Sequence, residues 1–191
     1  MGQRRKEKMS SVPKSQRSPT KFEAEHHFFE LRDRVTELML LDFGFSEEKY
    51  KKRIEHYRES HKSATNVDEV VSRYEKKCEA FKTQFIADER RAISDILRKV
   101  SVEFTAANSI YPSDTPARIS EYCQRRKHLN EAVAMCYALK QEIQYVIRTL
   151  PVDLNKYKAY DKAINEQIAL YKGVRKADNR FLKNKTKKNI G

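Results

Sequence analysis

The fold is indicated most clearly by the stretch at residues 129–150, which reads LNEAVAMCYALKQEIQYVIRTL. Its apolar side chains recur in steps of three, four and seven residues, at Leu129, Val133, Cys136, Ile143, Ile147 and Leu150. This period matches the 3.6 residues of one α-helical turn, so the side chains share one face. Lys140 interrupts the stripe, and we expect Leu139 to fill that gap while the lysine reaches solvent. The stretch predicts a long amphipathic helix, which begins at Thr115-Pro116 and which Pro151 ends.

A first helix is predicted upstream. Ser18 is placed as its N-cap with Pro19 in the first turn, and it runs to about Asp42, before Gly44. Its apolar stripe consists of Phe28, Leu31, Val35 and Leu38. A shorter helix capped by Ser46 follows at residues 46–62, with a thin apolar stripe, so we treat it as an additional piece beside the bundle.

Two more long helices complete the pattern. One begins after the N-cap Asn66, and its stripe shifts by one position after Phe85, which predicts a bend or a change of packing partner there. Residues 108–115 form a loop. The last helix is capped by Asp153, with Leu154, Tyr157, Tyr160, Ile164, Ile168 and Tyr171 facing inward, and is expected to end at Gly173.

The fold class predicted from these elements is all-α: an antiparallel four-helix bundle with an additional short helix and disordered basic tails. With only 4 Gly and 5 Pro among 191 residues, the chain has few of the turn residues that many short strands need. The domain organisation that we expect is a basic N-terminal tail at residues 1–19, a helical domain at 20–173 and a basic C-terminal tail at 174–191.

The positive charge is concentrated at the two ends of the chain. The net charge is +13. Residues 1–21 contain seven basic side chains and one acidic, residues 172–191 contain eight and one, and the 150 residues between them are balanced. A charge that only aided solubility would be spread more evenly, so this distribution favours a polyanionic partner such as nucleic acid.

The candidate nucleic-acid-binding residues are basic side chains of the tails and of one internal cluster. Within that cluster, Arg118, Arg125 and Arg126 fall on one side of their helix and would line up along phosphates. The alternative is a solvated surface paired with neighbouring carboxylates. The full candidate set is Arg4, Arg5, Lys6, Lys8, Arg118, Arg125, Arg126, Lys127, Lys172, Arg175, Lys176, Arg180, Lys183, Lys185, Lys187 and Lys188.

No pattern for catalysis or a cofactor is present. Glu23 and His26 have the Glu-x-x-His spacing of di-iron bundles, but such sites need the motif from two helices and the sequence has one copy. Gly-rich phosphate loops, Cys-x-x-Cys pairs and nucleophile motifs do not occur. We therefore expect no enzyme activity, no cofactor and no metal. The three scattered cysteines fit a reducing compartment, and no apolar stretch suits a membrane, so we expect a cytoplasmic protein.

Several stretches resemble one protein family. They are AANSIYP at residues 106–112, the pair Arg125-Arg126, EIQY at 142–145, PVDLNKY at 151–157 and the basic run at 172–180. Together they are similar to the four-helix-bundle accessory variability determinants of diversity-generating retroelements, which are related to the intervening-sequence proteins of ribosomal RNA genes. The resemblance spans roughly residues 20–180. The helix at 46–62, both tails and the neutral body depart from the family pattern, whose members are shorter and basic throughout.

The resemblance implies a ring-like homo-oligomer, a pentamer, that binds template RNA and a reverse transcriptase without catalysis. It places contacts at Arg125, Arg126, Arg175 and Lys176. Our functional hypothesis is a non-catalytic nucleic-acid-binding accessory protein, with RNA favoured over DNA. The alternative is a protein-interaction scaffold or a DNA mobilisation accessory factor, whose basic tails dock duplex DNA or an acidic protein.

Overall fold

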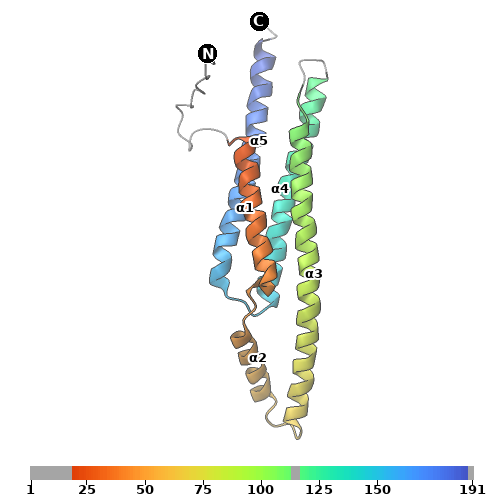
Figure 1. Cartoon of the computed structure of the whole chain (residues 1–191), viewed down its shortest axis with the longest axis vertical. Helices are drawn as coiled ribbons and strands as arrows, with labels where there is room; N and C mark the ends of the chain where they lie inside the picture. Colours follow the sequence, from red (N-terminus) through yellow and green to blue (C-terminus); the bar gives the residue numbers. More distant parts are fainter. Residues whose placement is uncertain (1–18, 113–116, 189–191) are drawn as a thin grey trace, which may run out of the picture.

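The computed structural model describes residues 19–112 and 117–188, with side chains through residue 179, and shows an all-helical bundle (Figure 1). The described residues contain no strand; Phe45 and Val152 form an isolated bridge. The elements are α1 (Lys21–Leu40), the 3₁₀ turn η2 (Asp42–Gly44), α2 (Glu47–Ser60), α3 (Val67–Ser109), α4 (Arg118–Thr149) and α5 (Leu154–Lys188).

Four of the helices form the predicted antiparallel bundle. Helix α4 packs against α3 on one side and α5 on the other, and α1 packs mainly on α5. Successive long helices run in opposite directions (Figure 1). The buried core includes the stripes predicted for α1 and α4, although Ile147 of α4 is only half-buried. In the stripe predicted for α5, Leu154 is 59% exposed and Tyr160 is half-buried.

The start of α1 differs by two residues from the prediction. Its N-cap is Thr20, whose hydroxyl accepts from the Glu23 amide while the Glu23 carboxylate accepts from the Thr20 amide. This reciprocal capping box satisfies two backbone donors of the first turn. Ser18 and the predicted cap at residues 115–116 lie outside the described residues.

Helix α1 ends in a turn with an unusual backbone. Asp42, Phe43 and Gly44 all have positive φ angles, of 49°, 59° and 68°. A non-glycine side chain there costs free energy that its surroundings must offset. Phe43 is fully buried and its carbonyl accepts a hydrogen bond from the Tyr157 hydroxyl at 2.5 Å. The turn is therefore held in place by α5, and it redirects the chain toward α2.

Helix α3 changes packing partner near Phe85, as its shifted stripe predicted. Before this position Tyr74 stacks on Tyr57 of α2, with ring centroids 3.8 Å apart. Phe85 itself contacts Tyr145 of α4 edge-on, at 5.3 Å. We call α2 together with residues 67–84 the hairpin, since this pair projects beyond the end of the four-helix section (Figure 1).

The prediction that the last helix ends at Gly173 is wrong, because α5 continues to Lys188 and crosses the expected boundary between bundle and tail. A Cβ at Gly173 would lie 2.4 Å from Cγ of Pro19. The glycine therefore provides a close crossing point for the chain entering α1 and does not end the helix. Val174 is buried, so the first part of the expected tail belongs to the core.

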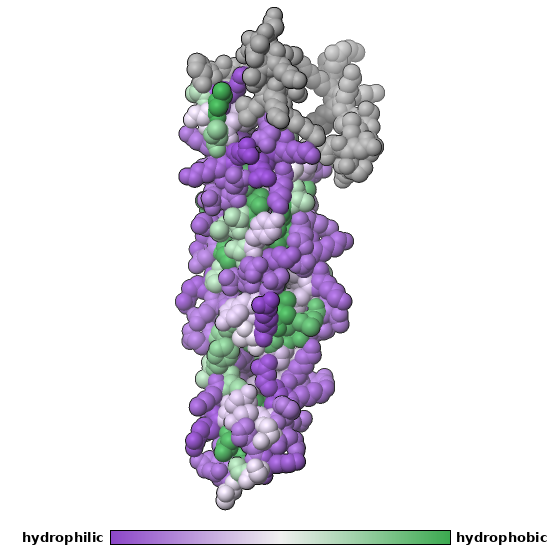
Figure 2. Space-filling view, turned by 180° about the vertical axis from the view of Figure 1, so that it is seen from behind, coloured by the Kyte–Doolittle hydropathy of each residue, from purple (hydrophilic) through white to green (hydrophobic). Residues whose placement is uncertain are grey.

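Figure 2 shows a mostly hydrophilic face with small, separate apolar patches. Within the described residues, no helix combines the length with the apolar character that a membrane crossing requires.

Candidate nucleic-acid interface

Both basic segments of the sequence attach to the same end of the bundle. Residues 1–18 precede Pro19, which contacts Gly173, and α5 extends from Gly173 to Lys188 at that end (Figure 1). Helix α4 begins there as well. We call this end the basic pole. Burial and the Arg125 guanidinium lower the pKa of Lys21, as expected where cations crowd together.

Arg125 does not lie where the sequence analysis expected it. It is only 3% exposed, whereas Arg126 is exposed and Arg118 is half-buried, so the predicted row of three guanidinium groups does not form. Arg125 Nε donates to Asp178 Oδ2 at 2.6 Å, and Nη1 donates to the Ala107 carbonyl at 2.5 Å. Arg125 thus joins α3, α4 and α5 inside the bundle.

Two of the other candidates meet on the surface between α4 and α5. Arg126 and Arg175 line a small hollow of about 70 Å³ together with Ile119, Tyr122, Cys123, Asp178 and Asn179. Arg175 Nη1 donates to Asn130 Oδ1 at 2.6 Å. Farther along, Lys172 Nζ donates to the Tyr137 hydroxyl at 2.8 Å. We call this row the seam: Arg126, Asn130, Tyr137, Lys172, Arg175 and Asn179.

The cations of the seam retain their charge for a ligand. Arg175 and Lys172 are bonded to neutral groups, and Arg126 forms no ion pair with any described residue. The carboxylate that lines the hollow, Asp178, is engaged by the buried Arg125. Three turns before Lys172 on α5, Asp161 is engaged by Lys140 at 2.8 Å. The seam is therefore a strip of net positive charge leading away from the basic pole.

The structure describes the side chains of only two of the remaining candidates. Lys127 and Lys176 are exposed. Arg180, Lys183, Lys185, Lys187 and Lys188 belong to the last turns of α5, where the backbone alone is described, and Arg4, Arg5, Lys6 and Lys8 lie outside the described residues.

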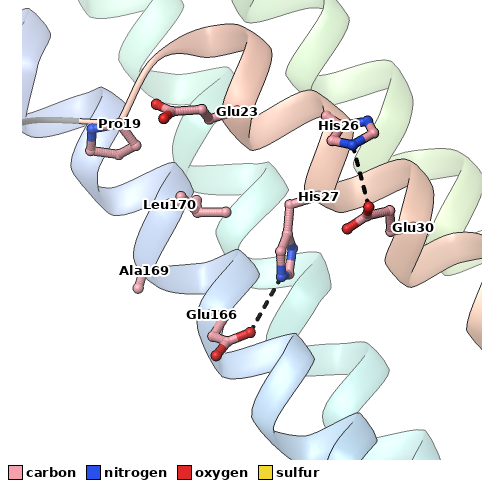
Figure 3. Close-up of a pocket in the computed structure, with 8 residues that line it drawn as sticks. All are labelled: Pro19, Glu23, His26, His27, Glu30, Glu166, Ala169 and Leu170. Carbon is pink, nitrogen blue, oxygen red and sulfur yellow. Dashed lines mark ion pairs between the residues drawn. The ribbon is translucent and has the colours of Figure 1, made fainter. Parts of the chain in front are cut away.

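A second concave region lies between α1 and α5 (Figure 3). It is a groove of about 590 Å³ lined by Pro19, Glu23, His26, His27, Glu30, Glu166, Ala169 and Leu170. Its polar groups are already paired: Glu23 caps α1, Glu30 pairs with His26 at 3.3 Å, and Glu166 pairs with His27 at 3.5 Å. Among the described residues no group of His, Cys, Asp and Glu is placed to hold a metal.

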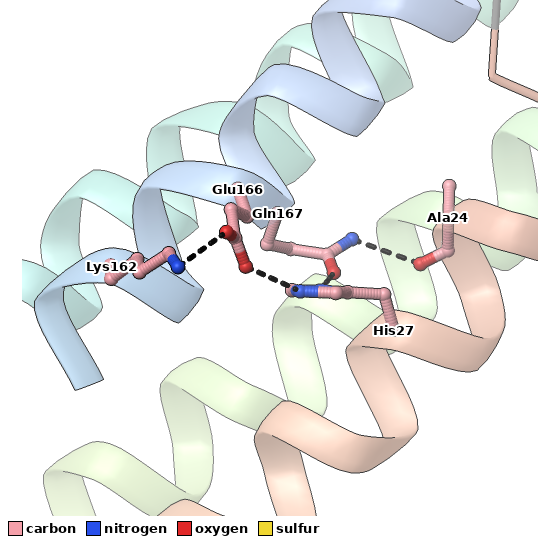
Figure 4. A network of polar contacts seen from close by, with 5 residues as sticks. All are labelled: Ala24, His27, Lys162, Glu166 and Gln167. Carbon is pink, nitrogen blue, oxygen red and sulfur yellow. Dashed lines mark hydrogen bonds and ion pairs between the residues drawn. The ribbon is translucent and has the colours of Figure 1, made fainter. Parts of the chain in front are cut away.

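One wall of this groove is a polar network that fastens α1 to α5 (Figure 4). Gln167, fully buried, donates to the Ala24 carbonyl at 3.0 Å, which leaves its Oε1 facing His27 Nδ1 at 2.6 Å. Lys162 extends the network to Glu166 at 3.8 Å. Because a buried amide is costly unless it is hydrogen-bonded, this arrangement fixes the relative position of the two helices.

The buried carboxyl of Glu89 in α3 faces the half-buried Glu142 of α4. Glu89 is 7% exposed and its Oε2 has no hydrogen-bond partner among the described residues. Burial, the Glu142 carboxyl across the interface and Asp88 raise the pKa of Glu89 to about 7. The group lies near Phe85, where α3 changes partner, and far along the chain from the seam.

Asn130 and Tyr137 were not predicted, although their spacing in the sequence carries a signal. Residues 119, 123, 126, 130 and 137 recur at helical spacing and form a second stripe beside the apolar one. Similarly, Arg125 lies three residues after Tyr122 and four before Leu129, which is the spacing of an inward position. The charged neighbours of Arg125 favoured a surface position, although its spacing predicts an inward one.

Comparison with known proteins adds no family to this description. No protein-family model matches the chain, no curated protein matches it, and neither does any solved structure. The similarity to retroelement accessory proteins therefore stays a prediction.

Proposed function

We propose that the protein is a non-catalytic accessory protein that binds RNA at the basic pole. The observation that supports this most directly is the convergence of charge: both basic terminal segments attach to one end of the bundle, next to a seam whose cations have neutral partners. Lysine and arginine side chains that neutralise phosphates release condensed counterions, which drives binding.

The arrangement favours an electrostatic anchor on a rigid platform. The long helices and the buried links made by Arg125 and Gln167 hold the seam in a fixed geometry, while the terminal segments supply additional charge. The resemblance described above favours template RNA and a reverse transcriptase as the partners, and a homo-oligomer as the working form.

The proposal is tested by measuring the affinity for a labelled structured RNA by fluorescence anisotropy between 50 and 200 mM salt. If about six phosphates are engaged, the affinity should fall on the order of a thousandfold across this range. An affinity that is independent of salt would contradict the mechanism.

The contribution of the terminal segments is measured with charge-removing variants. Truncation at residue 174 is unsuitable, because it removes the buried Val174 and leaves Arg125 without Asp178. Instead, one variant replaces Arg4, Arg5, Lys6 and Lys8 with glutamine, and another replaces Lys183, Lys185, Lys187 and Lys188. Each should flatten the salt dependence, and their combination should nearly abolish binding. Unchanged affinity of the combined variant would contradict the proposal.

Competition separates this proposal from the alternative of a scaffold. Duplex DNA and an acidic peptide are added to the preformed RNA complex. We expect unlabelled RNA to displace the probe at far lower concentration than either competitor. Efficient displacement by the acidic peptide would instead favour a protein-docking role.

A further inference from the structure

We propose that the seam binds an unpaired stretch of RNA and that Tyr137 stacks on one of its bases. This inference rests on the proposed function and specifies the part of the RNA that the α4–α5 surface recognises. Proteins that bind single strands combine a positively charged track with exposed aromatic rings. The seam contains both features in one row.

The charged part of the track lies on α5. Lys172, Arg175 and Asn179 are spaced by three and four residues and so lie on one face, spanning about 10 Å at 1.5 Å per residue. Arg126 faces this row from α4 across the hollow. Three cations without carboxylate partners can therefore contact successive phosphates of one strand.

The polar side chains of the seam leave hydrogen-bonding groups for a ligand. Asn130 accepts a hydrogen bond from Arg175 through its amide oxygen. Among the described residues, the N–H donors of the same amide have no partner. Asn179 lines the hollow beside Arg126. Amide groups of this kind can bond to the edges of bases that are not already paired.

Tyr137 has the exposure and the surroundings of a stacking platform. It is 45% exposed, although it belongs to a helix that is buried along its neighbouring face. Lys172 Nζ is 2.8 Å from the Tyr137 hydroxyl but 5.1 Å from the ring centroid. These two distances place the ammonium group beyond the hydroxyl, so it steadies the ring without covering its face.

The geometry favours an unpaired strand over a duplex. In a duplex the bases are stacked on each other and their faces are inaccessible to a protein side chain, whereas a splayed base can lie on an aromatic ring. An exposed tyrosine on the surface between α4 and α5 can meet such a base only when an unpaired strand lies along that surface. Phosphate contacts alone would not make this distinction.

The experiment compares a 12-nucleotide single-stranded RNA with the duplex of the same sequence, using the full-length chain. The variants are Tyr137→Ala and Tyr137→Phe, and the matched control is Tyr145→Ala, since Tyr145 is 51% exposed on another face of the same helix. We expect Tyr137→Ala to bind the single strand about tenfold more weakly. Tyr137→Phe keeps the ring but loses the bond to Lys172, so it should restore most of the affinity that Tyr137→Ala loses. Tyr145→Ala should bind like the wild type, and duplex binding should change less than about twofold for all three variants.

Ultraviolet cross-linking of the wild type to the single strand, followed by mass spectrometry, gives an independent measurement. A cross-linked peptide containing Tyr137 supports the inference. If Tyr137→Ala binds the single strand as tightly as the wild type, or loses affinity for the duplex to the same extent, the stacking inference is wrong. In either case a steep salt dependence of wild-type binding would still support the proposed function. Failure of the wild type to bind either RNA would overturn both. Far-ultraviolet circular dichroism verifies that the variants are folded.

Discussion

The seam and the hairpin differ in how their charged side chains are partnered. Five cations of the hairpin and its connecting turn lie against carboxylates: Arg58 pairs with Asp68 at 2.6 Å, and the other pairs are Lys52–Glu48, Lys62–Glu59, Arg73–Glu69 and Lys82–Glu79. In the seam, Lys172 and Arg175 bond to a hydroxyl and an amide. The same residue types therefore serve as mutual surface pairs in one region and as unneutralised charge in the other.

This difference shows that the number of basic residues in a region does not by itself identify a binding surface. A lysine beside a carboxylate presents little net field to a polyanion, while a lysine beside a neutral group presents all of its charge. Burial adds a third case, because Arg125 is buried in the bundle and pairs there with the half-buried Asp178, so this pairing affects stability and not recognition.

The largest effect is expected from breaking the buried pair. Arg125→Ala leaves Asp178, 25% exposed, without its cation, and should lower the free energy of unfolding by about 3 kcal/mol. Arg58→Ala in the hairpin breaks a pair of exposed side chains and should cost less than about 1 kcal/mol. Urea unfolding measures both. Equal costs would contradict the distinction between an interior and a surface pair.

The next effect concerns RNA affinity. Replacement of Arg126, Lys172 and Arg175 with glutamine removes three phosphate contacts and should weaken binding roughly 100-fold at 100 mM salt. The salt slope should fall by about two to three. The matched control replaces three exposed hairpin cations, Lys51, Arg53 and Lys76, and changes the net charge equally. If both triple variants lose affinity to the same extent, total charge and not the seam determines binding.

A third prediction concerns Glu89, which lies between the two regions. Its pKa rises from 4.5 in the unfolded chain to about 7 in the folded protein, so folding favours the protonated carboxyl. The free energy of unfolding is therefore unaffected by this group below pH 4.5. It decreases as the pH rises through 7, because the buried carboxyl must then ionise in the folded protein. Glu89→Gln removes the ionisation and should stabilise the protein by on the order of 2 kcal/mol at pH 8.5.

At pH 4 the same substitution should have little effect on stability, because the carboxyl is protonated in both states. Asp95→Asn serves as the control, since its side chain is 62% exposed on the same helix and is not among the groups that raise the pKa of Glu89. Urea unfolding at the two pH values gives the comparison. A stabilisation by Glu89→Gln that did not depend on pH would contradict the assigned cause.

The sequence predicted the structure correctly where local periodicity determines burial, and incorrectly where a contact between distant positions determines it. The stripe Phe28, Leu31, Val35 and Leu38 was correct because burial of apolar surface follows helical periodicity. Gly173 was misinterpreted, because local propensity favours a helix end there and only the tertiary contact with Pro19 reveals its role. Arg125 was placed on the surface because its neighbours are charged, whereas its partner Asp178 lies 53 positions away in the sequence. Pairing over such a separation is not visible from one sequence.

The smallest effect is expected inside the hairpin. Tyr57 of α2 stacks on Tyr74 and on His61, at 3.8 and 4.1 Å, and this cluster joins α2 to α3 where the other bundle helices do not reach. Tyr57→Ala should therefore loosen α2 locally, by about 1 kcal/mol. Amide hydrogen exchange should accelerate in α2 while the protection of α4 and α5 stays constant, and the RNA affinity should remain that of the wild type. Faster exchange along the seam, or weaker RNA binding, would mean that the hairpin and the seam are energetically coupled. The two regions could then not be compared as independent surfaces.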